Sequence, residues 1–199
     1  MRSRIFTWLG REFVELNGEA KPAANAGIET QQLFQTFNRE LNSHGLSLDH
    51  TVRSRLWGRD RQSRDLGSVE RVKILSGKAR SASSSYIAPA HFDSSASVAL
   101  DLIAMRPTMA GAQKHIVEYE PPIAPIRFLV YDSVVVLSGV TTVLPTLAEQ
   151  FDNIFPRITV SLADAKTAWE KVVRVSFYLH RSQSLDHLKA LFSRHVSAK

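Results

Sequence analysis

The stretch IFTWLGREFVELNG at residues 5–18 aligns without a gap with IRFLVYDSVVVLSG at residues 126–139. Each copy places two runs of partly alternating apolar and polar residues around a polar or glycine-containing turn, a pattern typical of a β-hairpin. The copies are 121 positions apart. The same offset aligns further pairs without a gap, among them Phe34 with Phe155, Leu41 with Leu162 and Val52 with Val173. One shared offset over this length indicates an internal repeat.

In the first copy, a helix is expected to follow the hairpin. Its apolar stripe has i, i+1, i+4, i+8 spacing and consists of Leu33, Phe34, Phe37 and Leu41. Thr30 is the expected N-cap and Gly45 the expected C-terminal cap. The remaining expected elements are a strand at 51–60, a helix at 66–75 and strands at 81–89 and 97–105.

The second copy predicts the same elements but stops before the last two strands. Residues 173–180 alternate cleanly between apolar and polar side chains and predict a strand, and residues 185–195 predict a helix. Pro156 falls inside the first expected helix of this copy. A proline there predicts either a kinked helix or a late start, with Asp152 or Asn153 as N-cap.

The resulting pattern is ββ-α-β-α-ββ followed by ββ-α-β-α. Strands with two helices on one face make a two-layer α+β unit, and two such units are expected in tandem, the second truncated. The expected domains are a complete unit at 1–106, a proline-rich linker at 107–124 and an incomplete unit at 125–199.

Composition limits the functional classes. The 199-residue chain is 44% hydrophobic, contains no cysteine and carries a formal net charge of +6. The absence of cysteine excludes disulfides and thiolate chemistry, and the short apolar runs predict a protein without a membrane span. We expect a soluble, cytoplasmic protein. No metal-ligand or nucleotide-binding motif is present, so no metal and no cofactor is expected.

Several segments resemble the RidA/YjgF/L-PSP family of imine and enamine deaminases. The segments are ELNGEA (15–20), HGLSLDHTVRSRLWGRD (44–60), ARS (79–81) and VALDLIAM (98–105), and in the second copy LSGVT and AWEKVVRVSFYL. The resemblance covers nearly the whole chain. It implies that each unit has the chorismate-mutase-like fold of this family.

The resemblance also implies a site. The arginine of the family's Pro-Ala-Arg-Ser segment binds the carboxylate of the substrate, which makes Arg80 the expected anchor; Lys78 replaces the proline. A guanidinium suits this role because its planar fork matches a carboxylate. Asn17, Gly18, Ser81 and Ser83 are expected to line the substrate pocket.

Two departures from the family concern the chemistry. Ala99 stands where the family commonly has a glutamate that positions water or moves a proton. Asp101, on the same strand face, is the candidate catalytic substitute, and a role as the partner of a nearby basic residue is an equal alternative. The second copy would place its equivalent of Arg80 at position 201, beyond Lys199, so this copy cannot form the site alone. Without the resemblance, the favoured interpretation of Arg80 is a surface arginine that stabilises the dipole at a helix C-terminus.

Three functions remain open at this stage. The first is Rid-type hydrolytic deamination of a 2-imino or enamine acid, or of a related small carboxylated compound. The second is non-catalytic binding of a small acid or a protein. The third, ranked last, is RNA binding or endoribonuclease-like activity, suggested by the arginines between Arg53 and Arg80. Because members of the family are typically trimers, the resemblance implies a homo-oligomer with a trimer as one form.

Overall fold

The computed structural model describes residues 1–197, so the last two residues of the expected domain 125–199 lie outside it. The chain forms two compact units that divide after Gly139. This division differs from the boundary expected at 107–124. The structure keeps both that segment and the second hairpin with the first unit, because both pack against the first sheet.

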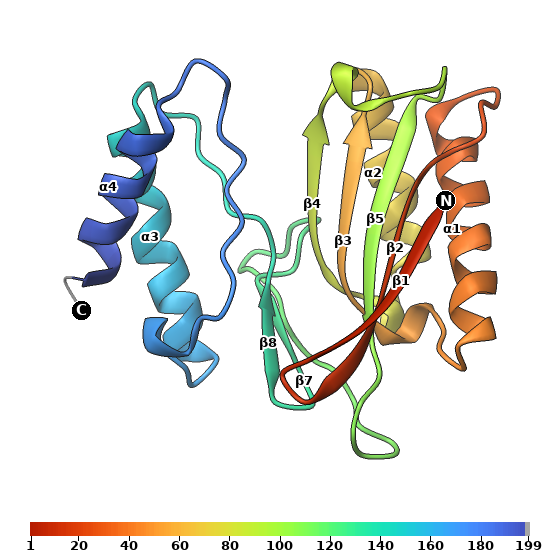
Figure 1. Cartoon of the computed structure of the whole chain (residues 1–199), viewed down its shortest axis with the longest axis horizontal. Coiled ribbons are helices and arrows are strands. Elements are labelled where there is room, and N and C mark those ends of the chain that lie inside the picture. Colours follow the sequence, from red (N-terminus) through yellow and green to blue (C-terminus); the bar gives the residue numbers. More distant parts are fainter. Residues whose placement is uncertain (198–199) are drawn as a thin grey trace. The chain divides into compact units, whose positions relative to one another are not determined.

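The first unit contains a five-stranded sheet in the order β1-β2-β5-β3-β4. Its strands are β1 (Arg2–Trp8), β2 (Arg11–Glu19), β3 (Thr51–Gly58), β4 (Ala82–Ile87) and β5 (Val98–Met105). Two helices, α1 (Ala26–Ser43) and α2 (Arg61–Ile74), cover one face of the sheet (Figure 1). The expected two-layer ββ-α-β-α-ββ unit is confirmed for this part of the chain.

Local polar residues fix where these helices begin. Asn25, not Thr30, caps α1, and its side chain accepts a hydrogen bond from the backbone N–H of Ile28 at 3.0 Å. Asp60 caps α2, which therefore starts five residues before the expected position. The first turn of α2 is polar, so an apolar stripe could not reveal it. Gly45 follows the end of α1 with φ +68°, which confirms the expected C-terminal cap.

The main core lies between the helices and the sheet. Alternate strand residues point to the helices because successive side chains of a strand face opposite sides. The largest fully buried members of this core are Leu16, Phe34, Phe37, Leu41, Leu56, Leu100 and Leu102. The apolar stripe of the first helix was thus correctly predicted.

The second hairpin covers part of the helix-free face of the same sheet. It consists of β7 (Phe128–Tyr131) and β8 (Val134–Leu137), and β6 (His115–Val117) adds a third strand in the order β6-β7-β8. The buried core between the two sheets consists of Phe13, Val52, Ala82 and Met105 from the first sheet, Leu129 and Tyr131 from the second, and Ile126 just before β7. The second hairpin therefore completes the first unit instead of starting a separate fold.

Residues just after β8 also protect the edge strand β4. The backbone N–H of Ser83 donates to Ser138 Oγ at 3.1 Å, and the N–H of Gly139 donates to Ser83 O at 3.1 Å. A Cβ atom at Gly139 would lie 2.9 Å from the Cβ of Ser84. Only glycine allows this close approach, which occupies hydrogen-bonding groups that an edge strand would otherwise expose.

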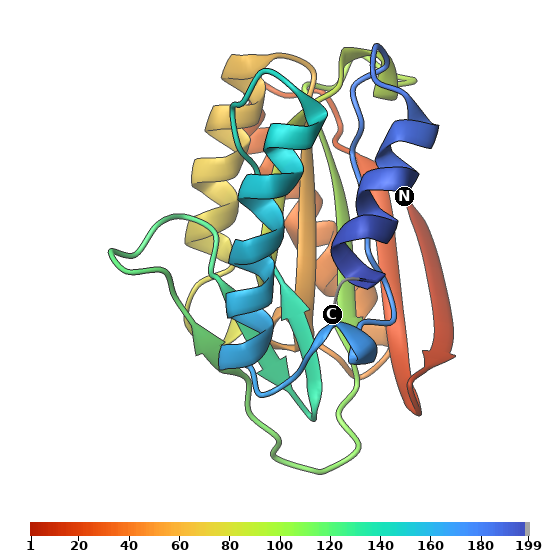
Figure 2. The ribbon, with the colours of Figure 1, turned by 90° about the vertical axis from the view of Figure 1, so that its left-hand side faces the viewer.

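The second unit is helical in the described residues. It contains α3 (Leu147–Asp164) and α4 (Leu185–Ser197), which pack against each other (Figure 2). Thr146 caps α3 in a reciprocal arrangement with Glu149. The expected late start at Asp152 or Asn153 is therefore wrong, and Pro156 lies inside the helix. Aromatic ring contacts connect α3, α4 and the segment between them; the rings are those of Phe151, Phe155, Trp169, Phe177 and Phe192.

The strand predicted at residues 173–180 is wrong, because these residues have no strand assignment. In the first unit the equivalent strand, β3, pairs with both β4 and β5. Residues 140–197 contain no strand that could provide such pairing. Alternation alone cannot make a strand when the backbone has no partner for its hydrogen bonds. The second unit therefore does not repeat the fold of the first.

No helix within residues 1–197 combines the length and the apolar character needed to span a bilayer.

Candidate functional site

Arg80 lies in the short connection between α2 and β4. A 3-10 turn at Gly77–Ala79 precedes it, and its backbone N–H donates to Gly77 O at 3.2 Å. Since α2 ends at Ile74, Arg80 lies six positions beyond the helix and is not in its last turn. Arg80 is therefore too far from the C-terminus of α2 to stabilise the helix dipole, which was the alternative interpretation.

The guanidinium of Arg80 is already bound to a carboxylate of the same unit. Nε lies 2.6 Å from Glu118 Oε1, and Nη2 lies 2.9 Å from Glu118 Oε2. Nη2 also contacts the carbonyl oxygen of Ile123 at 3.4 Å. The side chains of Arg80 and Glu118 are 22% and 33% exposed, so solvent reaches both. This two-point geometry is the one that a free carboxylate would adopt on an arginine.

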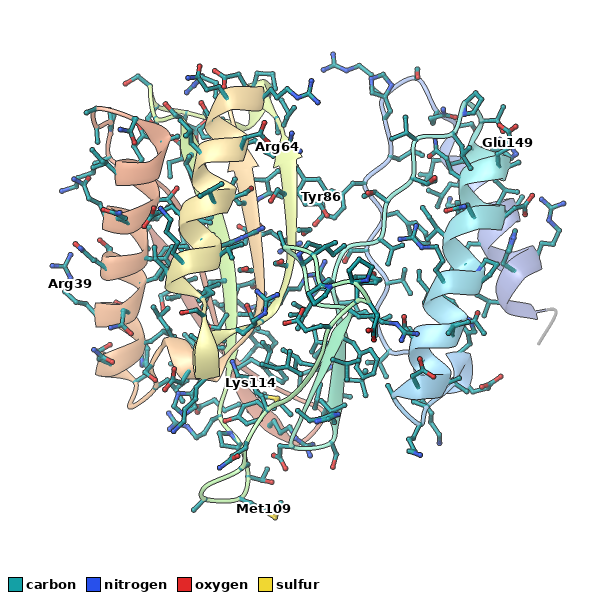
Figure 3. All side chains as sticks on the ribbon, turned by 180° about the vertical axis from the view of Figure 1, so that it is seen from behind. Arg39, Arg64, Tyr86, Met109, Lys114 and Glu149 are labelled. Carbon is teal, nitrogen blue, oxygen red and sulfur yellow. The ribbon has the colours of Figure 1, made fainter. Side chains whose placement is uncertain are left out.

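Lys114 fixes the backbone beside Arg80. Its Nζ donates to Arg80 O at 3.0 Å and to Thr51 O at 2.9 Å. Burial lowers the pKa of Lys114 to about 8, while the negative charge of Asp49 acts in the opposite direction. Figure 3 shows Lys114 near the C-terminal end of α2. Nothing in the sequence around Lys114 indicated this role.

Next to Arg80 is a small polar cavity of about 10 Å³. Its lining includes the predicted site residues Arg80, Ser81 and Ser83, together with Ser54 and Arg71. Val72, Leu75 and Ala124 complete the lining. The structure thus brings together three of the residues expected to bind substrate and adds two that the sequence analysis missed.

Arg71 is the most buried cation in this group. It is 5% exposed and donates through Nη1 to Ser84 O at 2.6 Å and through Nη2 to Ser85 Oγ at 2.9 Å. Burial lowers its pKa to about 10, so it stays protonated at neutral pH. Arg71 is one of several arginines within 53–80, and its sequence gave no reason to separate it from the exposed ones.

The other predicted residues lie elsewhere on the sheet. Asp101 on β5 pairs with Asn17 on β2 and with Arg55 on β3, and Arg55 pairs with Ser84 on β4. Asp101 is therefore two strands across from β4 and four residues along from Arg80. These steps correspond to about 10 Å and about 13 Å. The structure does not bring Asp101, Asn17 and Gly18 together with Arg80.

Asp101 has its own partners on the helix-free face. Its Oδ2 lies 3.2 Å from Arg55 Nε and accepts a hydrogen bond from Trp57 Nε1 at 3.0 Å. Trp57 stacks on Tyr86 with ring centroids 4.8 Å apart, and Figure 3 shows Tyr86 projecting from β4 away from the helices. These contacts explain Asp101 as the acidic partner of neighbouring donors. A catalytic role for Asp101 stays a prediction.

The arginines of the basic stretch engage different parts of the unit. Arg55 is paired with Asp101, Arg71 is buried and Arg80 is bound by Glu118. Arg59 donates to the carbonyl oxygen of Ala96 at 2.9 Å. These four arginines of the stretch therefore each make contacts within the protein, on different elements of the unit. Residues 1–197 also contain no group of three His, Cys, Asp or Glu side chains placed to hold a metal ion.

No protein-family model matches the sequence, and no curated protein matches it. Solved structures do match. One is Rv2704 from Mycobacterium tuberculosis, a member of the YjgF/YER057c/UK114 family, with 18% identity, a TM-score of 0.43, and coverage of 47% of this chain and 79% of that chain.

A second solved structure is NMB1025 from Neisseria meningitidis, a member of the YjgF family. It is 14% identical with a TM-score of 0.45, and the match covers 55% of this chain and 98% of that chain. A third is yeast Mmf1, with 18% identity, a TM-score of 0.43 and coverage of 48% and 84% respectively. The chain is thus similar, over about half of its length, to solved members of the YjgF family.

Proposed function

We propose that the first unit binds a small carboxylic acid at Arg80, in exchange for Glu118. The supporting observation is the two-point contact between Arg80 and Glu118. A ligand carboxylate can replace the side-chain carboxylate without changing the hydrogen bonds that the guanidinium makes. The exchange is feasible because both partners are partly exposed, and such ion pairs hold their partners weakly.

The chemical class of the ligand follows from the space around Arg80. Ser81 and Ser83 offer small polar side chains rather than a large apolar surface. The resemblance to the Rid family suggests a 2-oxo, 2-imino or enamine acid with a short side chain. The amino group or oxygen next to the carboxylate could then hydrogen-bond to a serine hydroxyl.

Hydrolysis of a 2-imino acid is the second candidate. Glu118 favours it, because a carboxylate that leaves Arg80 stays close to the bound ligand and can accept a proton from an attacking water. Water would add to the imine carbon to give a carbinolamine, and the proton accepted by Glu118 would pass to its amino group. That group would leave as ammonia, and the hydroxyl would lose its proton to become the carbonyl of the 2-oxo acid. In this scheme Glu118, and not Asp101, moves the proton. It thereby replaces the glutamate that the Rid family commonly has at the position of Ala99.

Calorimetric titration with 2-oxobutyrate tests the binding proposal. Wild type should bind, whereas Arg80→Gln should lose binding and Arg39→Gln should retain it. Arg39 is a suitable control because it is exposed on α1, where it contacts Thr36 (Figure 3). Equal binding by wild type and Arg80→Gln would contradict the proposal.

Ammonia release from freshly generated 2-imino acids tests the hydrolysis candidate separately. Wild type should release ammonia faster than the uncatalysed reaction, and Glu118→Gln should not, although it still binds 2-oxobutyrate. A wild-type protein that binds 2-oxobutyrate without accelerating ammonia release would exclude hydrolysis and leave the binding proposal intact.

A further inference from the structure

Three cations lie close to the proposed carboxylate site, and two of them have an acidic neighbour. Arg80 is paired with Glu118, with 2.6 Å between Nε and Oε1. Lys114, whose Nζ donates to Arg80 O at 3.0 Å, is influenced by the negative charge of Asp49. The third cation is Arg71, which lines the same cavity as Arg80.

Arg71 forms no hydrogen bond or ion pair with an acid within residues 1–197. Its guanidinium donates to Ser84 O at 2.6 Å and to Ser85 Oγ at 2.9 Å, and both oxygens are uncharged. Burial lowers the pKa of Arg71 to about 10, and the influence that opposes this shift comes from Tyr86 instead of a carboxylate. Arg71 is therefore a protonated, buried cation, and solvent screens its charge only weakly.

This distribution of charge leaves an excess of one positive charge when a monocarboxylic acid binds. In the proposed exchange, the carboxylate of the ligand takes the place of Glu118 and neutralises Arg80 alone. The charge of Arg71, on the same cavity, stays unbalanced. A ligand with a second carboxylate supplies the missing negative charge, and a weakly screened cation attracts it more strongly than an exposed one does.

The second carboxylate does not need to enter the cavity. A volume of about 10 Å³ is about the space that one water molecule requires, so a carboxylate stays outside it. A water molecule in the cavity can accept hydrogen bonds from its lining and donate one to the ligand. Attraction between the carboxylate and Arg71 also acts without contact, because Coulomb energy falls slowly with distance in a medium of low permittivity.

We infer that the site at Arg80 is selective for short dicarboxylic acids with a 2-oxo or 2-imino group, and that Arg71 determines this selectivity. The inference rests on the proposed function, because one carboxylate must bind Arg80 before the second can approach Arg71. It narrows the ligand from any small carboxylic acid to one that carries two negative charges.

Two ligands that differ in one charge provide the test. 2-Oxoglutarate has a second carboxylate, whereas its 5-methyl ester has an uncharged group at that position. In calorimetric titration of the full chain, wild type should bind 2-oxoglutarate about tenfold more tightly than the ester. Equal affinities would overturn the inference and leave the proposed function intact. If wild type binds neither of these ligands nor 2-oxobutyrate, the proposed function fails and the inference fails with it.

Two variants distinguish the charge of Arg71 from the net charge of the protein, since each removes one positive charge. In Arg71→Met, the ratio of the two affinities should fall to about one. In Arg39→Met, at an exposed position on α1 (Figure 3), the ratio should stay at about ten. A wild-type ratio in Arg71→Met would contradict the inference, even if both ligands bind more weakly, because that result assigns Arg71 a structural role only.

Two further measurements keep the test decisive if Arg71→Met does not fold. Arg71→Lys retains the charge and should retain most of the preference for 2-oxoglutarate. In wild type, raising sodium chloride from about 0.1 M to about 1 M shortens the screening length from about 10 Å to about 3 Å. A preference that depends on buried Arg71 should fall by only about twofold. Disappearance of the preference at high salt would assign it to exposed surface charge and overturn the inference.

Discussion

Arg11 and Asp132 occupy equivalent positions in the two hairpins, 121 residues apart, and they form an ion pair with 3.1 Å between Nε and Oδ2. Asp132 also accepts hydrogen bonds from the backbone N–H and hydroxyl of Thr108 at 2.7 and 2.9 Å. One carboxylate thus connects the turn of the second hairpin to the first hairpin and to the segment between them. The two repeated hairpins are therefore joined by a direct ion pair within the first unit.

Asp132→Asn should loosen the second hairpin without unfolding the sheet below it. Asn accepts the left-handed backbone that Asp132 has, with φ +45°, so the substitution mainly removes the charge. Amide hydrogen exchange should become faster in Phe128–Leu137 and stay unchanged in α1. Asp186→Asn, at a side chain that is 94% exposed, is the matched control.

The same contact predicts a pH dependence. Hydrogen bonds from Thr108, with a further contribution from Arg11, lower the pKa of Asp132 below its ordinary value of 3.8. A lowered folded-state pKa contributes stability that is present above pH 3.8 and lost as the pH falls through the folded-state value. Exchange in the hairpin of wild type should therefore approach that of Asp132→Asn in strong acid. A constant difference between the two proteins down to pH 2 would contradict this.

Glu118→Gln should strengthen the binding of small carboxylic acids. The substitution removes the carboxylate that competes for Arg80, while the size of the side chain is retained. Because the ion pair is partly exposed, the gain in affinity should be about two- to fivefold. Titration with 2-oxobutyrate measures it. Glu12→Gln, which removes the partner of Arg106 at 2.9 Å, should leave the affinity unchanged.

Asp101→Asn separates the two groups of predicted site residues. It should weaken the contact with Arg55 and perturb Trp57, and so lower the free energy of unfolding by about 1–3 kcal/mol. Binding of 2-oxobutyrate should persist, since Asp101 lies two strands away from β4. Chemical denaturation followed by tryptophan fluorescence gives the first quantity and calorimetry the second. If the variant folds but no longer binds 2-oxobutyrate, Asp101 contributes to the ligand site and this prediction is wrong.

Gly139→Ala tests the protection of the edge strand. The added methyl group would lie 2.9 Å from Ser84 Cβ, so either β4 or the end of β8 must shift. Overpacking of this kind costs about 1–3 kcal/mol. Urea denaturation should show a lower midpoint, and exchange should increase at the N–H of Ser83 and Gly139. An unchanged midpoint would mean that the backbone shifts without cost.

Lys114 predicts a rise in stability at alkaline pH. Burial gives it a folded-state pKa of about 8 against an ordinary value of 10.5, so the unfolded chain binds more protons above pH 8. The free energy of unfolding should therefore increase with pH from about 8 up to 10.0, the ordinary pKa of Tyr131, whose own raised pKa has the opposite effect beyond that point. Lys114→Met should remove the increase, whereas Lys78→Met, at an exposed position, should not.

Periodicity predicted the first unit well because its elements satisfy local and tertiary requirements together. The stripe of Leu33, Phe34, Phe37 and Leu41 became the core face of α1. The same logic failed at residues 173–180, where alternation had no strand to pair with. The polar start of α2 was missed because capping by Asp60 depends on a side chain and not on an apolar pattern.

The candidate site was predicted in part. Arg80, Ser81 and Ser83 are adjacent in sequence and remain together in space. Glu118 and Arg71 could not be predicted. Glu118 comes from 38 residues away through a loop, and Arg71 reaches the cavity from a helix that also carries Arg61 and Arg64. Asp101 was grouped with Arg80 because strand order, which sets lateral distance, cannot be read from a pattern of side chains.

The sequence by itself determined the repeated hairpin, the two-layer α+β unit and the arginine before β4, since these follow from periodicity, turn residues and one short motif. Tertiary structure alone decided that the second hairpin packs on the first sheet, that Glu118 binds Arg80, and that Arg71 lies buried beside two unpartnered hydroxyls. The physical reason is that burial and charge pairing depend on contacts between distant segments, whereas local pattern reports only on neighbours along the chain.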